Sequence, residues 1–171
     1  MFYLFFISYL ELFLKNQSLT KYLADGISIF FLSKRNSCRS QMAEAILRSF
    51  DEKLNINSAG IEPVDHVSPI AIEVMAEIGI DLKPSVPHNF HDYKNLKIDY
   101  LITVGEGTLE ELKIPNLSFK RKLHLGFRSP YKRSKCRDEI REKCREVRDE
   151  LLAELDYFYH RILQHEISKP I

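Results

Sequence analysis

Cysteine is scarce in this sequence, and Cys38, Cys136 and Cys144 are too few for a disulfide framework in a chain of 171 residues. A chain without such a framework is typical of a reducing compartment, so we expect a cytoplasmic protein. No Cys-x-x-Cys pair occurs and the six histidines are scattered, so the spacing that metal ligands require is missing. The sequence therefore predicts no metal site, and nothing in it indicates a cofactor.

An excess of charge of one sign is missing as well. The 25 lysines and arginines nearly balance the 24 aspartates and glutamates, which gives a formal net charge of +1. This balance argues against a protein that binds nucleic acid or acidic surfaces through its overall charge. If the protein binds an anion, a local arrangement of groups must hold it.

A long apolar run is the third absence. Residues 1–14 are rich in apolar and aromatic side chains, but the unbroken run ends at Leu10, well short of the ~20 residues of a membrane span. A secretory signal is disfavoured, because no positive charge precedes the run and no small-residue cleavage site follows it. We expect residues 1–25 to be an extension whose helix, over 4–23, packs on the domain or on a partner. A peripheral membrane contact and a wrongly assigned start codon are the alternatives.

Apolar runs and helical spacing alternate along the rest of the chain. Short apolar runs predict strands over 27–32, 56–61, 100–104 and 117–125. Helical spacing and capping residues predict helices from about 37–39 to 50, over 69–78, over 108–113 and over 137–164, and residues 83–91 are predicted as loop. Alternating strands and helices predict one α/β domain over 26–171, with a four-stranded parallel sheet and helices on both faces. Cys144 falls on the apolar face of the last helix, as a core thiol would.

The loop over 33–40 joins the first strand to the first helix. At the carboxyl edge of a parallel sheet, such a connection is a usual ligand site, and the helix start favours an anion. Arg39 can offer its planar guanidinium to two oxygens of a tetrahedral oxyanion, and Asn36 tolerates the left-handed backbone of an anion nest. Ser40 can cap the loop, and the basic loop over 126–135 could extend its positive rim. The candidate anion-binding residues are Lys34, Arg35, Asn36, Ser37, Cys38, Arg39 and Ser40. A merely solvated helix start is the plain alternative.

The stretch SKRNSCRSQMAEAI in this region resembles the phosphate loop of low-molecular-weight protein tyrosine phosphatases and of thioredoxin- or glutaredoxin-coupled arsenate reductases, above all the cyanobacterial type. Further similarities are NSAGIEP over 57–63, the pattern from Val67 to Asp81, and the long final helix. Together they cover about residues 27–164. The resemblance implies the low-molecular-weight phosphatase fold and a loop that binds an inorganic oxyanion (phosphate, sulfate or arsenate) or a phosphorylated ligand.

Three positions depart from the family's catalytic pattern. The family's nucleophilic cysteine lies six residues before the loop arginine, where this chain has Ser33. The family's general acid is an aspartate directly before a proline, where this chain has Ser129. The arsenate reductases also need cysteines after the third strand, where residues 104–107 hold no sulfur. Since these losses occur together, we expect a degenerate arsenate reductase or phosphatase that binds the oxyanion and does not turn it over.

Two alternatives stay open. The chain could be an active phosphatase or arsenate reductase with Ser33 or Cys38 as an unorthodox nucleophile. Cys38 is followed by Arg39 and preceded by Lys34 and Arg35, which would lower the pKa of its thiol, although a cysteine in this place more often lies tucked against the loop. The chain could instead be a non-enzymatic interaction protein that uses its N-terminal helix.

Overall fold

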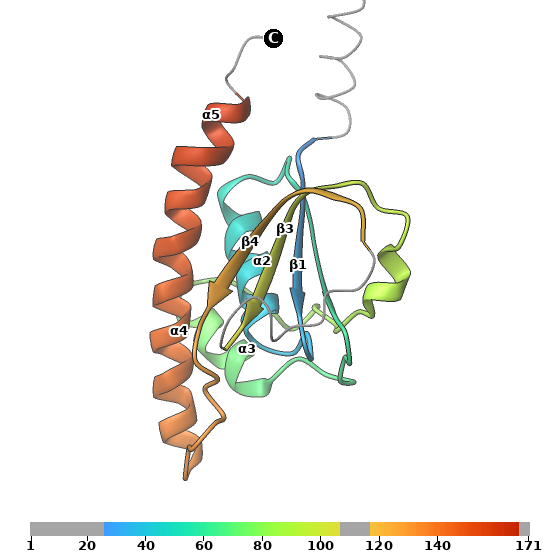
Figure 1. Cartoon of the computed structure of the whole chain (residues 1–171). Coiled ribbons are helices and arrows are strands. Elements are labelled where there is room, and N and C mark those ends of the chain that lie inside the picture. The colour runs from blue at the N-terminus through green and yellow to red at the C-terminus, as the bar shows by residue number, and fades with distance from the viewer. Residues whose placement is uncertain (1–25, 107–116, 168–171) are drawn as a thin grey trace, which may run out of the picture.

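The computed structural model of the chain describes residues 26–106 and 117–167 (Figure 1). The helices expected over 4–23 and over 108–113 lie outside these residues. Where the chain is described, no helix combines the length and the apolar composition that crossing a membrane would require.

Four strands of the described residues form one sheet. The strands are β1 (Ser28–Ser33), β2 (Asn55–Gly60), β3 (Ile98–Gly105) and β4 (Phe119–Gly126). They lie in the order β2-β1-β3-β4, and every neighbouring pair is parallel. The predicted four-stranded parallel sheet is confirmed.

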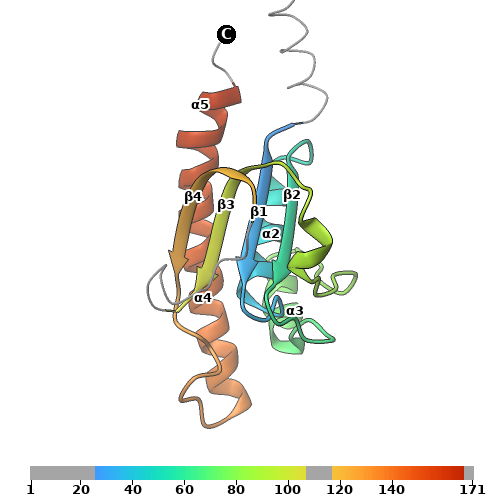
Figure 2. The same ribbon diagram turned by 45° about the vertical axis from the view of Figure 1, so that its right-hand side comes forward.

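Helices cover this sheet, as Figures 1 and 2 show. They are α2 (Arg39–Phe50), α3 (Pro69–Ala76), the 3₁₀ helix η1 (Phe90–Tyr93) and α4 (Arg137–Tyr157). Helix α4 continues as the π-helical turn η2 (Phe158–Leu163) and as α5 (Gln164–Ile167). Helices α2 and α4 pack on one face, while η1 lies against the other. The end of the predicted loop over 83–91 thus belongs to η1, whose first turn is capped by the Asn89 side chain at 3.0 Å from the His91 N–H.

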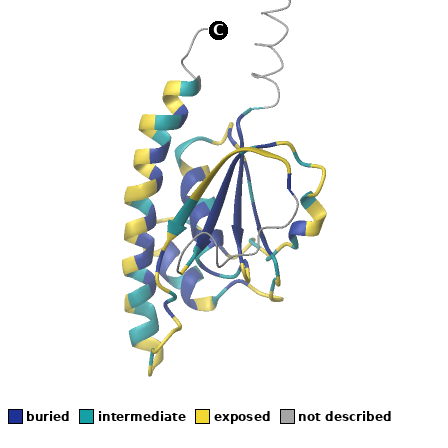
Figure 3. Cartoon of the chain, viewed as in Figure 1, coloured by how far each residue is buried: buried dark blue, intermediate teal, exposed yellow. Residues whose placement is uncertain are grey.

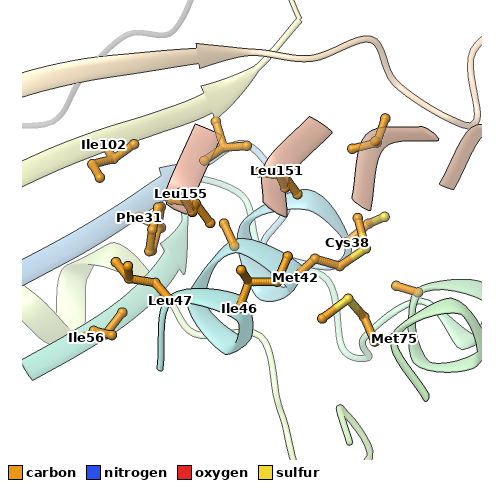
Figure 4. Packing of buried hydrophobic residues seen from close by; sticks show 14 of the residues in the cluster. Phe31, Cys38, Met42, Ile46, Leu47, Ile56, Met75, Ile102, Leu151 and Leu155 are labelled. Atoms are coloured by element: carbon orange, nitrogen blue, oxygen red, sulfur yellow. The ribbon is translucent and has the colours of Figure 1, made fainter. Parts of the chain in front are cut away.

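Successive side chains along β1 point to opposite faces of the sheet and enter two separate buried clusters. Phe31 belongs to the cluster formed with α2 and α4, while Phe30 and Leu32 belong to the cluster under η1. All three side chains are fully buried, so β1, one of the two inner strands, is apolar on both faces. Figure 4 shows Phe31 among side chains of α2 and α4, where Leu151 and Leu155 are also fully buried.

The apolar stripe predicted for the last helix faces this core. Cys144, Val147, Leu151, Leu155 and Phe158 are buried, and the opposite face of the helix is exposed (Figure 3). The predicted start of α3 is also observed, because the Ser68 hydroxyl accepts the Ala71 N–H at 3.3 Å and Pro69 follows the cap. The sequence pattern therefore correctly predicted the start of α3 and the buried face of α4.

Glu77 ties α3 to α4 and makes the stability of the fold depend on pH. Its carboxylate accepts hydrogen bonds from Arg145 and Arg148, and these contacts lower its pKa from 4.5 to about 2. A depressed carboxyl pKa stabilises the native state above the pKa of the unfolded chain, and this contribution is lost as the pH falls. We expect Glu77→Gln to flatten the loss of stability between about pH 4.5 and pH 2. Urea unfolding at a series of pH values measures this dependence of the free energy of unfolding on pH. The matched variant Glu154→Gln, at an exposed position of α4, should keep the wild-type profile, and equal profiles for both variants would contradict the assignment.

Candidate functional site

Backbone hydrogen bonds to the chain after β2 fix the loop between β1 and α2. The carbonyl oxygens of Ser33, Lys34 and Arg35 accept the N–H groups of Ile61, Glu62 and Val64 at 3.0, 2.8 and 3.2 Å. The carbonyl of Ser37 accepts the N–H of Ser68 at 2.7 Å. Since the C=O and N–H of one peptide group point in opposite directions, this pairing turns the following amides toward the inner side of the loop. Asn36 has φ 49°, the left-handed backbone that the sequence predicts there.

The Asn36 side chain lies beneath the loop, is 1% exposed, and uses all of its hydrogen-bonding capacity. Its Nδ2 donates to the hydroxyls of Ser40 at 3.0 Å and Ser58 at 2.8 Å. Its Oδ1 accepts the backbone N–H of His88 at 2.9 Å and the Gln41 side-chain amide at 3.0 Å. Asn36 therefore joins the loop, α2, β2 and the chain before η1 in one buried network.

A backbone N–H and a second hydroxyl converge on the side chain of Ser33. Its Oγ accepts the N–H of Asn36 at 3.0 Å and lies 2.8 Å from the Oγ of Ser40. Ser40 is 1% exposed and Ser33 is 7% exposed. The arrangement in which Ser40 donates leaves the free hydroxyl proton on the more accessible Ser33. Ser33 can then offer that proton to a ligand within the loop.

The end of β2 supports the loop from below. A Cβ at Gly60 would lie 3.1 Å from the carbonyl carbon of Arg35 and from the carbonyl oxygen of Lys34, and 3.2 Å from the Asn36 Cβ. These contacts are tighter than most Cβ contacts, so a side chain at position 60 would require the loop backbone to shift by a few tenths of an ångström. Glycine in the NSAGI stretch therefore lets the loop approach β2 closely.

Arg39 begins α2 and reaches across to the segment after β4. Its Nη1 donates to the carbonyl oxygen of Phe127 at 2.7 Å. Burial lowers the pKa of the guanidinium, and the nearby Glu106 carboxylate opposes that shift. A guanidinium stays charged in a folded protein, and a single N–H in this bond leaves its fork available to a second acceptor.

Ser129 lies on this same side of the molecule, next to a carboxylate that sequence reasoning missed. The Glu106 carboxylate accepts the backbone N–H of Ser129 and pairs with Lys132 at 3.0 Å. The Lys132 hydrogen bond is the main reason that the pKa of Glu106 is lowered. An ionised carboxylate cannot donate a proton, so Glu106 does not replace the missing acid at neutral pH. The available signal was its place at the carboxyl end of the third predicted strand.

Cys38 points away from the inner side of the loop and into the core (Figure 4). A hydrogen bond with Cys144 and burial raise the pKa of its thiol well above the usual value. The prediction that Lys34, Arg35 and Arg39 lower this pKa is therefore wrong: Arg39 does act in that direction, but it is outweighed. Cys144 is fully buried, which confirms the core thiol predicted from the sequence.

The remaining charged candidates lie at the surface. Lys34 and Arg35 are exposed, and Lys34 pairs with Glu62 at 3.5 Å. In the basic loop, Arg128 and Arg133 are exposed, as is Lys132, which pairs with Glu106. Such exposed pairs contribute little to stability, about 0–1 kcal/mol. These side chains can raise the electrostatic potential around the loop over 33–40, but they do not fix the position of a ligand.

Sequence reasoning also missed the buried polar partners of the loop, Gln41 and Ser58. Both are polar residues on the buried faces of their elements, and a polar residue at a core position is the signal that could have revealed them. No cluster of three or more His, Cys, Asp or Glu side chains suited to a metal ion occurs within residues 26–106 and 117–167.

The family profile and the most similar relatives of known function indicate the same protein family. Residues 28–160 match the family profile described as low molecular weight phosphotyrosine protein phosphatase. An arsenate reductase of Halalkalibacterium halodurans is 35% identical over 124 residues, which are 72% of this chain and 88% of that protein. Arsenate reductase 1 of Staphylococcus epidermidis is 36% identical over 141 residues, covering 79% of this chain and 97% of that protein.

The structural comparison agrees with the sequence comparison. A solved structure described as an arsenate reductase in the phosphate binding state superposes with a TM-score of 0.67 at 25% identity, over 80% of this chain and 98% of that one. Its sheet and helices correspond to the fold described above. Because the family profile matches residues 28–160 and relatives more than 30% identical cover over two thirds of the chain, the chain belongs to the low molecular weight phosphotyrosine protein phosphatase family.

Proposed function

We propose that the loop over 33–40 binds a phosphate-type oxyanion, free or on a phosphorylated ligand, and that the chain does not turn it over. The observation that carries this proposal is the outward pairing of the loop carbonyls, which presents amide N–H groups inward. Arg39 stands at the helix start, and the Ser33 hydroxyl can donate its proton to a ligand when Ser40 is the donor in their shared hydrogen bond. The arsenate reductase structure in the phosphate binding state supports the same ligand chemistry.

Lack of turnover follows from the residues at the reacting positions. A serine hydroxyl is a weak nucleophile unless a base removes its proton, and the hydrogen-bond neighbours of Ser33 are Ser40 and Asn36, neither of which is basic. Cys38 lies in the core with a raised pKa, so it does not supply a thiolate to the loop. Ser129 has no acidic proton, and the nearby Glu106 is ionised. The alternative in which Ser33 or Cys38 acts as nucleophile thus gains no support from the geometry.

Anion-dependent stabilisation tests the binding. We expect millimolar sulfate, phosphate or arsenate to raise the melting temperature of the wild type, because a ligand that binds only the native state stabilises it by mass action. Arg39→Ala should lose this rise, since it removes the guanidinium that faces the oxyanion. Differential scanning fluorimetry at constant ionic strength measures both.

Matched variants separate site binding from general charge. Arg128→Ala removes an exposed cation of the basic loop and should keep the anion response. Glu106→Gln removes the carboxylate beside Arg39 and should strengthen the response, because repulsion between carboxylate and oxyanion is lost. No stabilisation of the wild type would exclude the proposed function. Hydrolysis of an aryl phosphate that disappears in Ser33→Ala would show instead that Ser33 is a working nucleophile.

A further inference from the structure

Positive charge is in excess around the loop over 33–40. The described segments that follow the strands at this edge of the sheet contain six lysines and arginines but three aspartates and glutamates, over 33–39, 61–66, 105–106 and 126–133. Because all four strands are parallel, these segments lie at the same, carboxyl edge, toward which the arrowheads point in Figure 2. A chain with a formal net charge of +1 thus concentrates positive charge at the edge where the oxyanion is proposed to bind.

Hydrogen bonds hold the basic loop beside the anion loop. The carbonyl oxygen of Phe127 accepts the Arg39 guanidinium at 2.7 Å. Further along the basic loop, the hydroxyl of Tyr131 shares a hydrogen bond with the hydroxyl of Ser68. Ser68 in turn donates its backbone N–H to the carbonyl oxygen of Ser37 at 2.7 Å. The basic loop is therefore connected at two points to the residues that form or flank the anion loop.

Three arginines around the anion loop have no partner in the described part of the chain. Arg35, Arg128 and Arg133 are exposed, and none of them has an ion pair or a side-chain hydrogen bond within residues 26–106 and 117–167. By contrast, every arginine of α4 pairs with a carboxylate. The three guanidiniums, which we call the rim arginines, therefore keep their charge and their N–H groups available for a ligand.

We propose that the ligand of this site is a phosphoanhydride, an oxyanion that carries a second phosphate, and that the rim arginines favour the second phosphate through their charge. This inference rests on the proposed binding of one phosphate group by the loop. The loop amides and Arg39 hold the terminal phosphate, and a second phosphate joined to it through one bridging oxygen lies at the mouth of the loop. The rim arginines stabilise its negative charge without fixing its position, because their side chains are exposed and not held by other groups.

A second phosphate suits this rim better than an acidic peptide does. The bridging oxygen keeps the second phosphate next to the first, and Arg128 directly follows Phe127, whose carbonyl binds the Arg39 guanidinium. An acidic peptide that ran over the segment after β2 would meet Glu62 and Asp65, which are both exposed. Like charges repel, so the mixed charge of that segment disfavours an extended acidic partner.

Titration of the full chain with two inorganic anions tests the proposal. Isothermal titration calorimetry at neutral pH, without divalent cations, compares sodium phosphate with sodium pyrophosphate. We expect pyrophosphate to bind about tenfold more tightly, because it brings more negative charge to the rim arginines. This advantage should shrink as sodium chloride is added, since salt screens exposed charges. A parallel titration with adenosine diphosphate distinguishes a free diphosphate from a nucleotide, and either diphosphate supports the proposal if it exceeds phosphate by this factor.

Variants test whether the rim arginines cause the advantage. Arg128→Ala with Arg133→Ala should keep phosphate binding and reduce the advantage of pyrophosphate to about threefold or less. Arg128→Lys with Arg133→Lys should retain the advantage, because the positive charge is preserved. Lys97→Ala removes an exposed cation directly before β3, at the opposite edge of the sheet, and should behave as the wild type.

The outcomes that contradict the proposal are distinct from a failure of the proposed function. Equal affinities of the wild type for phosphate and both diphosphates would overturn it and leave the binding of one phosphate standing. An advantage that persists in the double alanine variant would overturn it as well. So would a glutamate-flanked phosphopeptide that depends on the rim arginines while neither diphosphate does. Absence of binding by every anion would instead reject the proposed function itself, and this inference with it.

Discussion

Asn36→Ala is expected to lower the free energy of unfolding by about 3–4 kcal/mol, a large effect for one polar side chain. The change leaves the buried Ser58 hydroxyl without the partner that Asn36 provides, and it removes the acceptor of the part-buried N–H of His88, an exposed residue. Each orphaned buried group costs about 1–3 kcal/mol. Alanine must also adopt the left-handed backbone of position 36, which adds about 1 kcal/mol. Urea unfolding followed by circular dichroism measures the loss.

Two companion variants separate these contributions. Asn36→Gly removes the same hydrogen bonds and accepts the positive φ, so it should be less destabilised than Asn36→Ala by about 1 kcal/mol. Lys34→Ala, at an exposed neighbour in the loop, should change stability by less than about 0.5 kcal/mol. A wild-type unfolding curve for Asn36→Ala would mean that the buried network contributes little.

Ser33→Cys is expected to create a nucleophile but only a slow phosphatase, whereas Ser33→Cys with Ser129→Asp should be faster by about 10²–10⁴-fold. At position 33 the introduced sulfur meets the Asn36 N–H and the Ser40 hydroxyl, and donors of this kind lower a thiol pKa. The thiolate can then attack phosphorus, but a poor leaving group still needs a proton. An aspartate at position 129 supplies that acid, as in the family pattern.

Steady-state kinetics on phenyl phosphate measures this gain, because its leaving group depends strongly on protonation. Ser33→Cys with Ser129→Asn is the matched control, since asparagine has nearly the shape of aspartate without an acidic proton. A slow rate for the control and a fast rate for the aspartate variant are expected. Equal rates for Ser33→Cys alone and for the double variant would contradict the role assigned to position 129.

Much of the fold could be predicted because apolar periodicity reports burial directly. The alternation in β1 and the stripe of α4 each depend on one face or both faces being buried. The prediction failed at the strand ends: β3 was expected over 100–104 and spans Ile98–Gly105. The charged Asp99 breaks the apolar pattern, so the strand was not predicted to begin before it. Its carboxylate accepts the Ser28 N–H at 2.9 Å and pairs with Lys120 on β4, and these contacts cannot be read from the local sequence.

The sequence predicted the backbone conformation of the loop better than it predicted the directions and partners of the side chains. Asn36 was recognised because a left-handed residue in a tight loop favours asparagine. The direction of Cys38 was not, because its thiol is governed by Cys144 on a helix 106 positions later in the chain. Glu106 was seen only as a position without sulfur, and its contact with Ser129 needed the packing of two loops. A prediction that counts only the charges near a residue in the sequence fails for Cys38 and Glu106, because their partners are distant in the sequence.

The hydrogen bonds that shape the loop have a consequence for mutational tolerance. Ile61, Glu62 and Val64 bond to the loop carbonyls through their backbone amides, so these three hydrogen bonds do not depend on which side chains stand at the three positions. Only proline, which has no N–H, would remove such a contact outright. These three backbone contacts of the loop can therefore persist when the side chains at positions 61, 62 and 64 change.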